Sequence, residues 1–224
     1  MKEENRLNIL KTRNILQELG MVFVTTVFFT VIILKVYKIN LRLPLNYDGD
    51  ALFSGYVIKT IHEYGWWFQN STIGMPFGAT LYDFSSFNFE SFNFLIIKIL
   101  VFILKDWGKV INIFYLSLFP ITAIMSHYVM RKLKINFYIS FLGSIYYTFL
   151  NYRFTRGINH LFLSAYYLIP LVVLLCYILY TDEMVFKIDK NFFKNKRNIF
   201  FLFLLIFLSL SGIYYVFFLC FFIF

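Results

Sequence analysis

Charged residues and cysteines are both scarce in this sequence. Of its 224 residues, 15% are charged and 60% are apolar, whereas a soluble domain is typically about 25% charged and about 45–50% apolar. The two cysteines, Cys176 and Cys220, lie inside apolar runs, so there is no disulfide framework, CxxC motif or zinc-type spacing. Walker, HExxH, GxSxG and Rossmann glycine motifs are also missing. A soluble fold of this size could not bury so much apolar surface, and the composition predicts an integral membrane protein.

The small charged fraction is strongly unbalanced, with a net charge of +9. Such an excess is typical of membrane proteins, in which lysine and arginine collect on the cytoplasmic side. No compact basic patch interleaved with aromatic residues occurs in a polar segment. We therefore expect the lipid bilayer, and no nucleic acid, as a partner.

Apolar runs along the chain predict an all-α fold, a polytopic bundle of transmembrane helices. A polar segment, residues 1–20, precedes a transmembrane domain that covers residues 21–224. Residues 92–104 form a short run that Lys98 interrupts, which favours an interfacial helix over a span. Five longer runs are predicted to cross the membrane, the second of them with a kink at Pro120: residues 21–36, 109–129, 135–150, 161–180 and 199–224.

The predicted topology follows from the basic residues. The N-terminal segment, the turn at 131–134 and the loop at 181–197 carry four, three and five lysines or arginines. All three lie on one side if residues 92–104 do not cross, and the positive-inside rule makes that side cytoplasmic. We therefore expect a multi-pass protein of the cell membrane with its N-terminus in the cytoplasm. The loop at 40–90 and the connector at 151–160 then face outward.

The outer loop is predicted to be structured, because it is rich in aromatic residues as well as glycine. Residues 50–64 form an amphipathic pattern, with Ile58 and Ile61 on an apolar face and Lys59 and Glu63 on a polar one. We expect a short helix there.

Asp48 and Asp50 flank Gly49 in the sequence NYDGD, just after the first apolar run. Two carboxylates at this spacing can share a divalent cation such as Mg²⁺ or Mn²⁺, or one of them can act as a general base. The structural alternative is that Asp50 only caps the helix that follows.

Asp83 belongs to a second cluster, GMPFGATLYDF, in which glycine and proline predict a compact turn. The turn would present Asp83 on the same outer face as Asp48 and Asp50. The alternative is a tight loop with a solvated aspartate.

The connector NYRFTRGINH carries Arg153, Arg156 and His160. Arginine on the outer side runs against the usual charge bias, and its guanidinium binds phosphate bidentately. His160 can carry a proton or bind a phosphate. The alternatives are lipid-headgroup anchors for the arginines and a polar helix cap for His160.

The joint order of these segments resembles the GT-C type of polytopic membrane glycosyltransferases, especially the YfhO-like bacterial membrane proteins. The resemblance covers roughly residues 44–218. It is carried by NYDGDALFSGYVIKTIHEYGWW, GMPFGATLYDF, YTFLNYRFTRGINHLFLSAYYLIPL and SGIYYVFF. The related proteins usually have proline where Ser85 follows Asp83-Phe84 here.

The resemblance implies transfer of a sugar from a polyprenyl-phosphate donor to a cell-envelope glycan or a teichoic-acid-like acceptor on the outer face. It implies Asp50, or Asp48 beside it, as the general base or metal ligand, and Asp83 as a second acidic group. It also implies contacts to the donor phosphate from three side chains of the connector: Arg153, Arg156 and His160.

Two alternatives remain open at this point. A flippase or transporter of lipid-linked glycans would carry charged residues deep inside its spans, and the predicted spans contain almost none. The related proteins have more helices, and the last apolar run here reaches Phe224. We therefore expect the chain to be the N-terminal part of a longer protein, which makes an inactive fragment or a subunit the other alternative.

Overall fold

The computed structural model describes residues 2–81, 90–181 and 192–223. These residues are mostly helical, which confirms the predicted all-α class. The helices are α1 (Lys2–Ile33), α2 (Gly49–Tyr64), α4 (Ser91–Leu104), α5 (Trp107–Lys132), α6 (Phe137–Thr148), α7 (Asn151–Arg156), α8 (Ile169–Thr181), α9 (Lys196–Ser209) and α10 (Ile213–Ile223). Short 3-10 turns and strands complete the list: η1 (Val36–Lys38), β1 (Gln69–Asn70), β2 (Ala79–Thr80), η3 (Tyr166–Leu168) and η4 (Phe192–Lys194).

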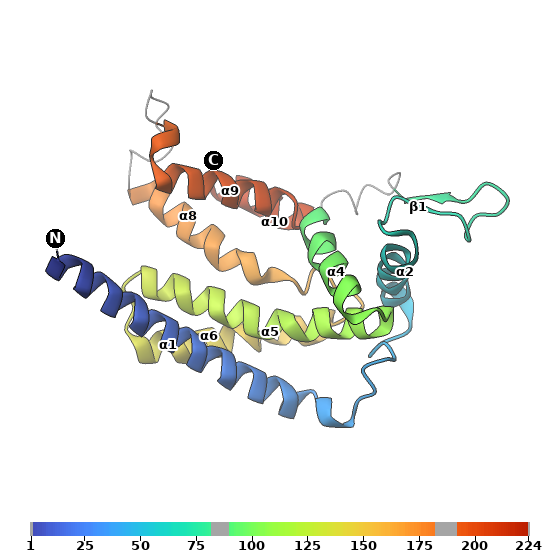
Figure 1. The fold of residues 1–224 in the computed structure, drawn as a ribbon, viewed down its shortest axis with the longest axis horizontal. Helices are drawn as coiled ribbons and strands as arrows, with labels where there is room; N and C mark the ends of the chain where they lie inside the picture. The colour runs from blue at the N-terminus through green and yellow to red at the C-terminus, as the bar shows by residue number, and fades with distance from the viewer. Residues whose placement is uncertain (1, 82–89, 182–191, 224) are drawn as a thin grey trace.

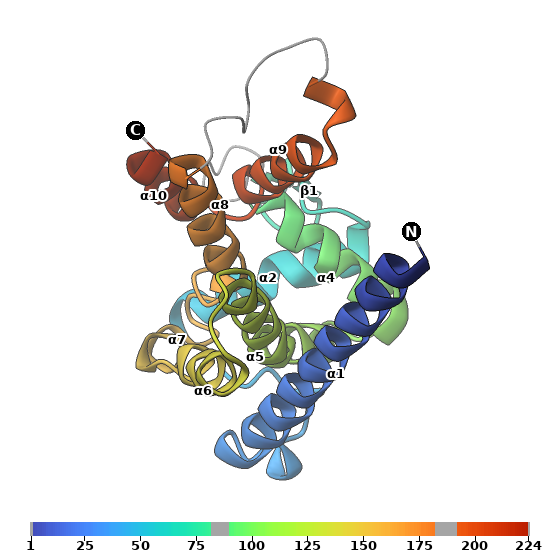
Figure 2. The ribbon, with the colours of Figure 1, turned by 90° about the vertical axis from the view of Figure 1, so that its left-hand side faces the viewer.

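Helix α5 is the centre of the bundle. Figures 1 and 2 show α1 and α6 along one side of α5 and α8, α9 and α10 along the other, while α2 and α4 lie across one end. Apolar side chains are buried around most of α5, as expected for a helix with neighbours on every side. The helix continues through Pro120.

Because α1 and α5 are antiparallel, each end of the pair carries residues from both. At one end the carboxylate of Glu18 lies 2.8 Å from Nε of Arg131. At the other end the loop that follows α1 contacts Asn112 of α5, with 3.0 Å between the Leu45 nitrogen and the amide oxygen. We call these the Glu18 end and the Asp50 end of the bundle.

Two helices of the described ranges, Asn14–Ile33 and Trp107–Lys132, have the length and apolar composition needed to cross a membrane. They overlap the first two predicted spans. The helices at the other three predicted spans are shorter. Of these, α6 has 12 residues and α8 has 13, whereas a straight span takes about 20.

The last two predicted spans differ from the structure in form. Helical structure in the run at 161–180 begins only with η3, because residues 161–164 form turns. The run at 199–224 is not one helix: the chain turns at 210–212, where Gly212 has a φ of 127°. Only glycine adopts that conformation readily, so α9 ends and α10 begins as a separate helix.

Helix α2 confirms the predicted amphipathic segment, starting one residue earlier than expected. Val57, Ile58 and Ile61 are fully buried against the bundle, and the Lys59–Glu63 pair faces solvent. Gly65 ends the helix in a left-handed conformation, donating its N–H to the Ile61 carbonyl.

The predicted compact turn forms the tip of a small hairpin after α2. Strand β1 pairs antiparallel with β2, which places Asn70 opposite Ala79. The buried Asn70 amide donates to Thr60 Oγ1 at 2.9 Å, so the hairpin is attached to α2. Gly74 and Gly78 both have positive φ angles, as a turn this tight requires.

The Asn112 side chain fastens the loop after α1 to the central helix. Its amide nitrogen donates to the carbonyl oxygens of Leu41 and Leu43, at 2.9 and 2.6 Å, and its oxygen accepts from the Leu45 nitrogen. The side chain is fully buried. One turn earlier, any side chain at Gly108 would overlap the Arg42 carbonyl oxygen, so the loop backbone lies directly on α5.

Replacing Asn112 by alanine is expected to destabilise the fold. Three backbone groups of the loop would lose their partner in a partly buried place, and a group kept from water there costs about 1–3 kcal/mol. The measurement is thermal unfolding of the purified chain in detergent. Ser117→Ala on the same helix is the control, because that hydroxyl donates only to Phe114 one turn away. Equal Tm values for the two variants would contradict the proposed role of Asn112.

Candidate functional site

The two aspartates of the first motif lie at the exposed start of α2. Asp48 occupies the N-cap position, but its side chain makes no capping hydrogen bond; the first turn is closed instead by the Ala51 nitrogen donating to the Asp48 carbonyl at 3.0 Å. Asp50 lies within the first turn. The alternative that Asp50 is the cap is therefore wrong, and capping occupies neither carboxylate.

The structure brings Asp50 together with His160, although they are far apart in sequence. Oδ2 of Asp50 lies 3.4 Å from Nδ1 of His160, and both side chains are partly exposed. Beside them Asn46 donates from Nδ2 to Oδ1 of Asn159 at 2.7 Å. Two of the predicted motifs thus form one surface at the Asp50 end.

The two arginines of the connector differ in burial. Arg156 is exposed, with its guanidinium carbon 5.6 Å from the centre of the Tyr152 ring. Arg153, one turn earlier on α7, is fully buried. The Arg153 side chain does not reach the surface. Its direct contact with a donor phosphate stays a prediction.

The Arg153 guanidinium is buried without a carboxylate within 4.0 Å among the described residues. It lies between two aromatic rings, 4.7 Å from the centre of Phe119 and 4.3 Å from that of Tyr166. Nη2 donates to Thr122 Oγ1 at 2.6 Å and Nε donates to the Tyr166 hydroxyl at 3.2 Å, while Nη1 has no hydrogen-bond partner. Aromatic faces and hydroxyl dipoles therefore replace a counter-ion.

Tyr166 also connects this cation to the end of α6. Its hydroxyl lies 3.2 Å from the carbonyl oxygens of Tyr147 and Thr148, to which it donates. Carbonyls at the C-terminus of a helix carry partial negative charge, which favours a nearby cation. This arrangement explains how the fold holds an unpaired guanidinium, and it fixes α7 against α5.

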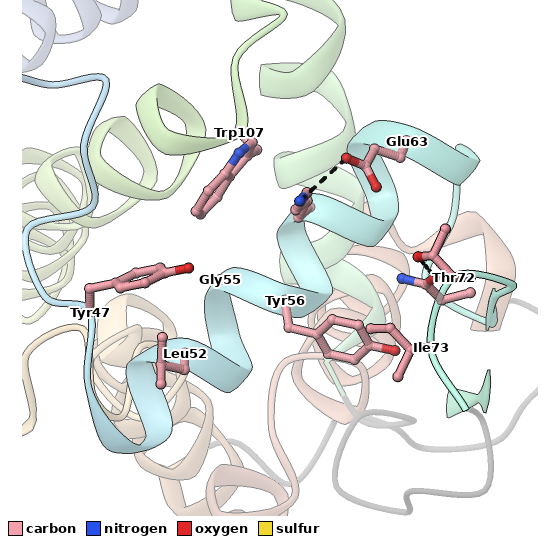
Figure 3. Close-up of a pocket in the computed structure, with 10 residues that line it drawn as sticks. Tyr47, Leu52, Gly55, Tyr56, Glu63, Thr72, Ile73 and Trp107 are labelled. Carbon is pink, nitrogen blue, oxygen red and sulfur yellow. Dashed lines mark hydrogen bonds and ion pairs between the residues drawn. The ribbon is translucent and has the colours of Figure 1, made fainter. Parts of the chain in front are cut away.

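A pocket of about 280 Å³ with both polar and apolar lining residues lies along α2. We call it the polar pocket; of its lining residues, Tyr47 and Leu52 are close to Asp50 in the chain. Figure 3 shows Tyr47 and Trp107 on one side of α2, with Thr72 and Ile73 on the other. The Lys59 ammonium and the Glu63 carboxylate, 3.7 Å apart, form a charged part of the lining. Aromatic walls with a few polar groups are suited to a ring-shaped polar ligand.

An apolar groove adjoins the polar pocket. The groove has a volume of about 450 Å³, and its lining is almost wholly apolar. Both hollows share Leu52, Tyr56 and Ile73, so they meet along α2. Gly49 lines the groove, directly beside Asp50 in the chain.

The predicted divalent cation needs ligands in addition to Asp48 and Asp50. Among the residues that the structure describes, no group of three or more His, Cys, Asp or Glu side chains is arranged to hold a metal ion. The side chains of the described residues therefore do not assemble such a site. Asp83, the predicted second acidic group, falls in the segment 82–89, outside the described residues.

Glu90 is a buried acid that the sequence analysis did not single out. Its Oε2 accepts a hydrogen bond from Asn93 Nδ2 at 2.7 Å, and the Asn93 oxygen accepts from the Tyr167 hydroxyl at 2.9 Å. A Cβ added at Gly212 would lie 3.2 Å from Oε1. Burial raises the pKa of Glu90 to about 8, although the Asn93 hydrogen bond opposes the shift. A lone acid directly before an apolar run was the available sequence signal.

The raised pKa of Glu90 predicts that the protein loses stability as the pH rises. The folded state keeps this proton up to about pH 8, whereas an ordinary glutamate releases it near 4.5. The stabilisation is therefore complete below about pH 4.5 and is lost as the pH rises through 8. Thermal unfolding between pH 4.5 and 9 should show Glu90→Gln with a flatter profile and a higher Tm than the wild type at pH 9.

The exposed Glu63→Gln variant is the control for this measurement and should keep the wild-type slope. A Glu90→Gln variant with the same pH profile as the wild type would show that Glu90 is ionised in the folded state.

Comparison with known proteins identifies no relative of this chain. No family model, curated protein or solved structure matches it. The assignment of function therefore rests on the chemistry of the residues described above and on their positions.

Proposed function

We propose that this chain is a membrane-embedded glycosyltransferase of the GT-C, YfhO-like type, or the N-terminal part of one. It transfers a sugar from a polyprenyl-phosphate donor to a cell-envelope glycan or a teichoic-acid-like acceptor. One observation carries the proposal. Asp50 is in contact with His160, and residues close to Asp50 in the sequence line both the polar pocket and the apolar groove. A lipid-linked sugar has a polar ring and an apolar chain, joined by a phosphate.

In the proposed polytopic arrangement α1 and α5 cross the membrane completely. The Glu18 end, with Arg131, Lys132 and Lys134, is cytoplasmic by the positive-inside rule. The Asp50 end then faces outward. The shorter helices α6 and α8 cross together with the residues that adjoin them, of which 161–168 are mostly buried in the bundle.

In the proposed reaction, Asp50 acts as the general base. Its carboxylate takes the proton from an acceptor hydroxyl while that oxygen bonds to the anomeric carbon of the donor sugar. The bond between this carbon and the phosphate oxygen breaks, and the electron pair leaves with polyprenyl phosphate. His160, with Nδ1 toward Asp50, and the exposed Arg156 provide donors for the departing phosphate. The buried Arg153 supports these groups indirectly, because it holds α7 against α5.

Asp50→Asn is expected to lower sugar transfer by about 100-fold or more, the scale of a lost general base. The measurement is transfer from a radiolabelled polyprenyl-phosphate sugar in membranes that contain the longest natural form of the protein. Asp106→Asn is the control at the same end of the bundle. Asp106 caps α5 by accepting from the Lys109 nitrogen at 3.0 Å, and asparagine caps equally well. Full activity of Asp50→Asn would refute the proposed base.

A transporter or flippase of lipid-linked glycans is the second candidate. The buried Arg153 favours it, because charged residues deep within a bundle are characteristic of translocation pathways. The same membranes separate the two functions: movement of an intact lipid-linked glycan across the bilayer, with no sugar transfer from any donor, would support the transporter.

Tyr47 is expected to stack on the sugar ring in the polar pocket. Its side chain is 67% exposed, so its replacement should leave the fold intact. Tyr47→Leu removes the aromatic face and should raise KM for the donor by about 2- to 12-fold, the range of one aromatic contact. Tyr47→Phe keeps the ring and should stay close to the wild type. If Tyr47→Leu and Tyr47→Phe have equal KM values, the sugar does not stack there.

A further inference from the structure

A second polar pocket lies at the Glu18 end, the opposite end of the bundle from Asp50. It has a volume of about 490 Å³ and is formed by α1 and the end of α5. Its lining includes Arg131, Lys132 and Lys134. Nothing in the proposed sugar transfer uses this pocket.

The one acidic residue of the lining is already neutralised. Oε2 of Glu18 lies 2.8 Å from Nε of Arg131 and 3.2 Å from Nε2 of His127, and Oε1 lies 3.2 Å from Nη2 of Arg131. His127 is fully buried behind the pair. Glu18 therefore orients Arg131 and leaves little negative charge facing the pocket.

The two lysines of the lining keep their charge available. Lys132 lies over the Tyr128 ring, 5.3 Å from its centre. Neither Lys132 nor Lys134 has a carboxylate within 4.0 Å among the residues described. Three cations against one carboxylate give the lining a formal charge of +2.

The backbone at this end does not oppose an anion. Three of the last four carbonyls of α5 accept hydrogen bonds: Val129 from Leu133, Met130 from Ile135 and Arg131 from Lys134, at 2.9, 3.0 and 3.1 Å. Arg131 Nη1 also donates to the Ile135 carbonyl at 2.8 Å. The partial negative charge of the helix end is thus satisfied locally.

An apolar surface continues from the pocket along α1. Met21 and Phe28 follow the pocket-lining Asn14 at intervals of seven residues, so they lie on the same face of α1, and they are 48% and 59% exposed. A free phosphate makes no favourable contact with an apolar surface. A lipid carries its phosphate next to acyl chains, which can cover such a surface.

We propose that this pocket binds the phosphate of an anionic membrane lipid, with the acyl chains along the exposed face of α1. Arg131, oriented by Glu18, offers a planar donor group, and Lys132 and Lys134 add point charges. Basic pockets between membrane helices on the cytoplasmic side suit such headgroups. The site requires the proposed membrane insertion but is independent of sugar transfer.

The test is a thermal-shift titration of the full chain after its extraction from membranes in a neutral detergent. Phosphatidylglycerol should raise the Tm with saturation, and phosphatidylcholine should not. The Lys132→Gln, Lys134→Gln double variant should bind phosphatidylglycerol roughly 10- to 30-fold more weakly, as expected for the loss of two cations near a headgroup.

Lys35→Gln, Lys38→Gln is the matched control at the other end of α1. It removes the same two charges, and there too one lysine lies over a tyrosine ring while the other has a positive φ. This variant should keep the wild-type affinity. An equal loss in both double variants, or equal shifts from the two lipids, would overturn the proposal.

Inorganic phosphate distinguishes the two sources of the anion. Millimolar phosphate that shifts the Tm as far as the lipid does would make the site a free-anion site and overturn the lipid assignment. Asn14→Glu, which adds a carboxylate to the lining, should weaken lipid binding without removing a lysine, and unchanged affinity in this variant would also overturn it. Recovery of the chain outside the membrane fraction would refute insertion itself, whatever the result for sugar transfer.

Discussion

The Asp50 end of the protein depends on the hydrogen bonds of one amide, that of Asn112. The loop after α1 has no helix or sheet of its own between η1 and α2, so its polar backbone groups need partners elsewhere. Asn112 satisfies three of them from the central helix, and Gly108 lets the backbone lie close enough. The positions of Tyr47, Asp48 and Asp50 follow from this attachment.

Helix α5 relates the two ends of the molecule. It carries Asn112 near one end and Arg131 at the other, and both contact the chain at opposite ends of α1. Between them Thr122 accepts from the buried Arg153, which holds α7 and the connector to His160. The proposed catalytic surface and the proposed lipid site are therefore held by a single helix with polar contacts at three levels.

Parts of this architecture could be predicted from the sequence, because they follow from local patterns. The amphipathic spacing of Ile58 and Ile61 against Lys59 and Glu63 defined α2 to within one residue. The break between α9 and α10 could not be found in the same way, since an unbroken apolar run has no polar face to show where a helix ends. Gly212, in a Ser-Gly pair, was the one local sign.

The sequence indicated which residues belong to the candidate site better than it indicated how they are arranged. Charge counting placed Asp50 and His160 on one side, but their contact depends on the lengths of α6 and α7 and on the turns that follow. From the sequence alone, Arg153 and Arg156 were both predicted to contact the donor phosphate. Helical spacing puts them on nearby positions, yet α7 is so short that packing against Phe119 and Tyr166 decided which side chain turned inward.

In the folded protein, the two arginines respond differently to dissolved salt. Mobile ions screen an exposed charge such as Arg156 strongly, but they screen a buried one far less. The contacts of Arg153 with its buried partners Thr122 and Tyr166 are accordingly a fixed property of the fold, nearly the same in dilute buffer and in concentrated salt.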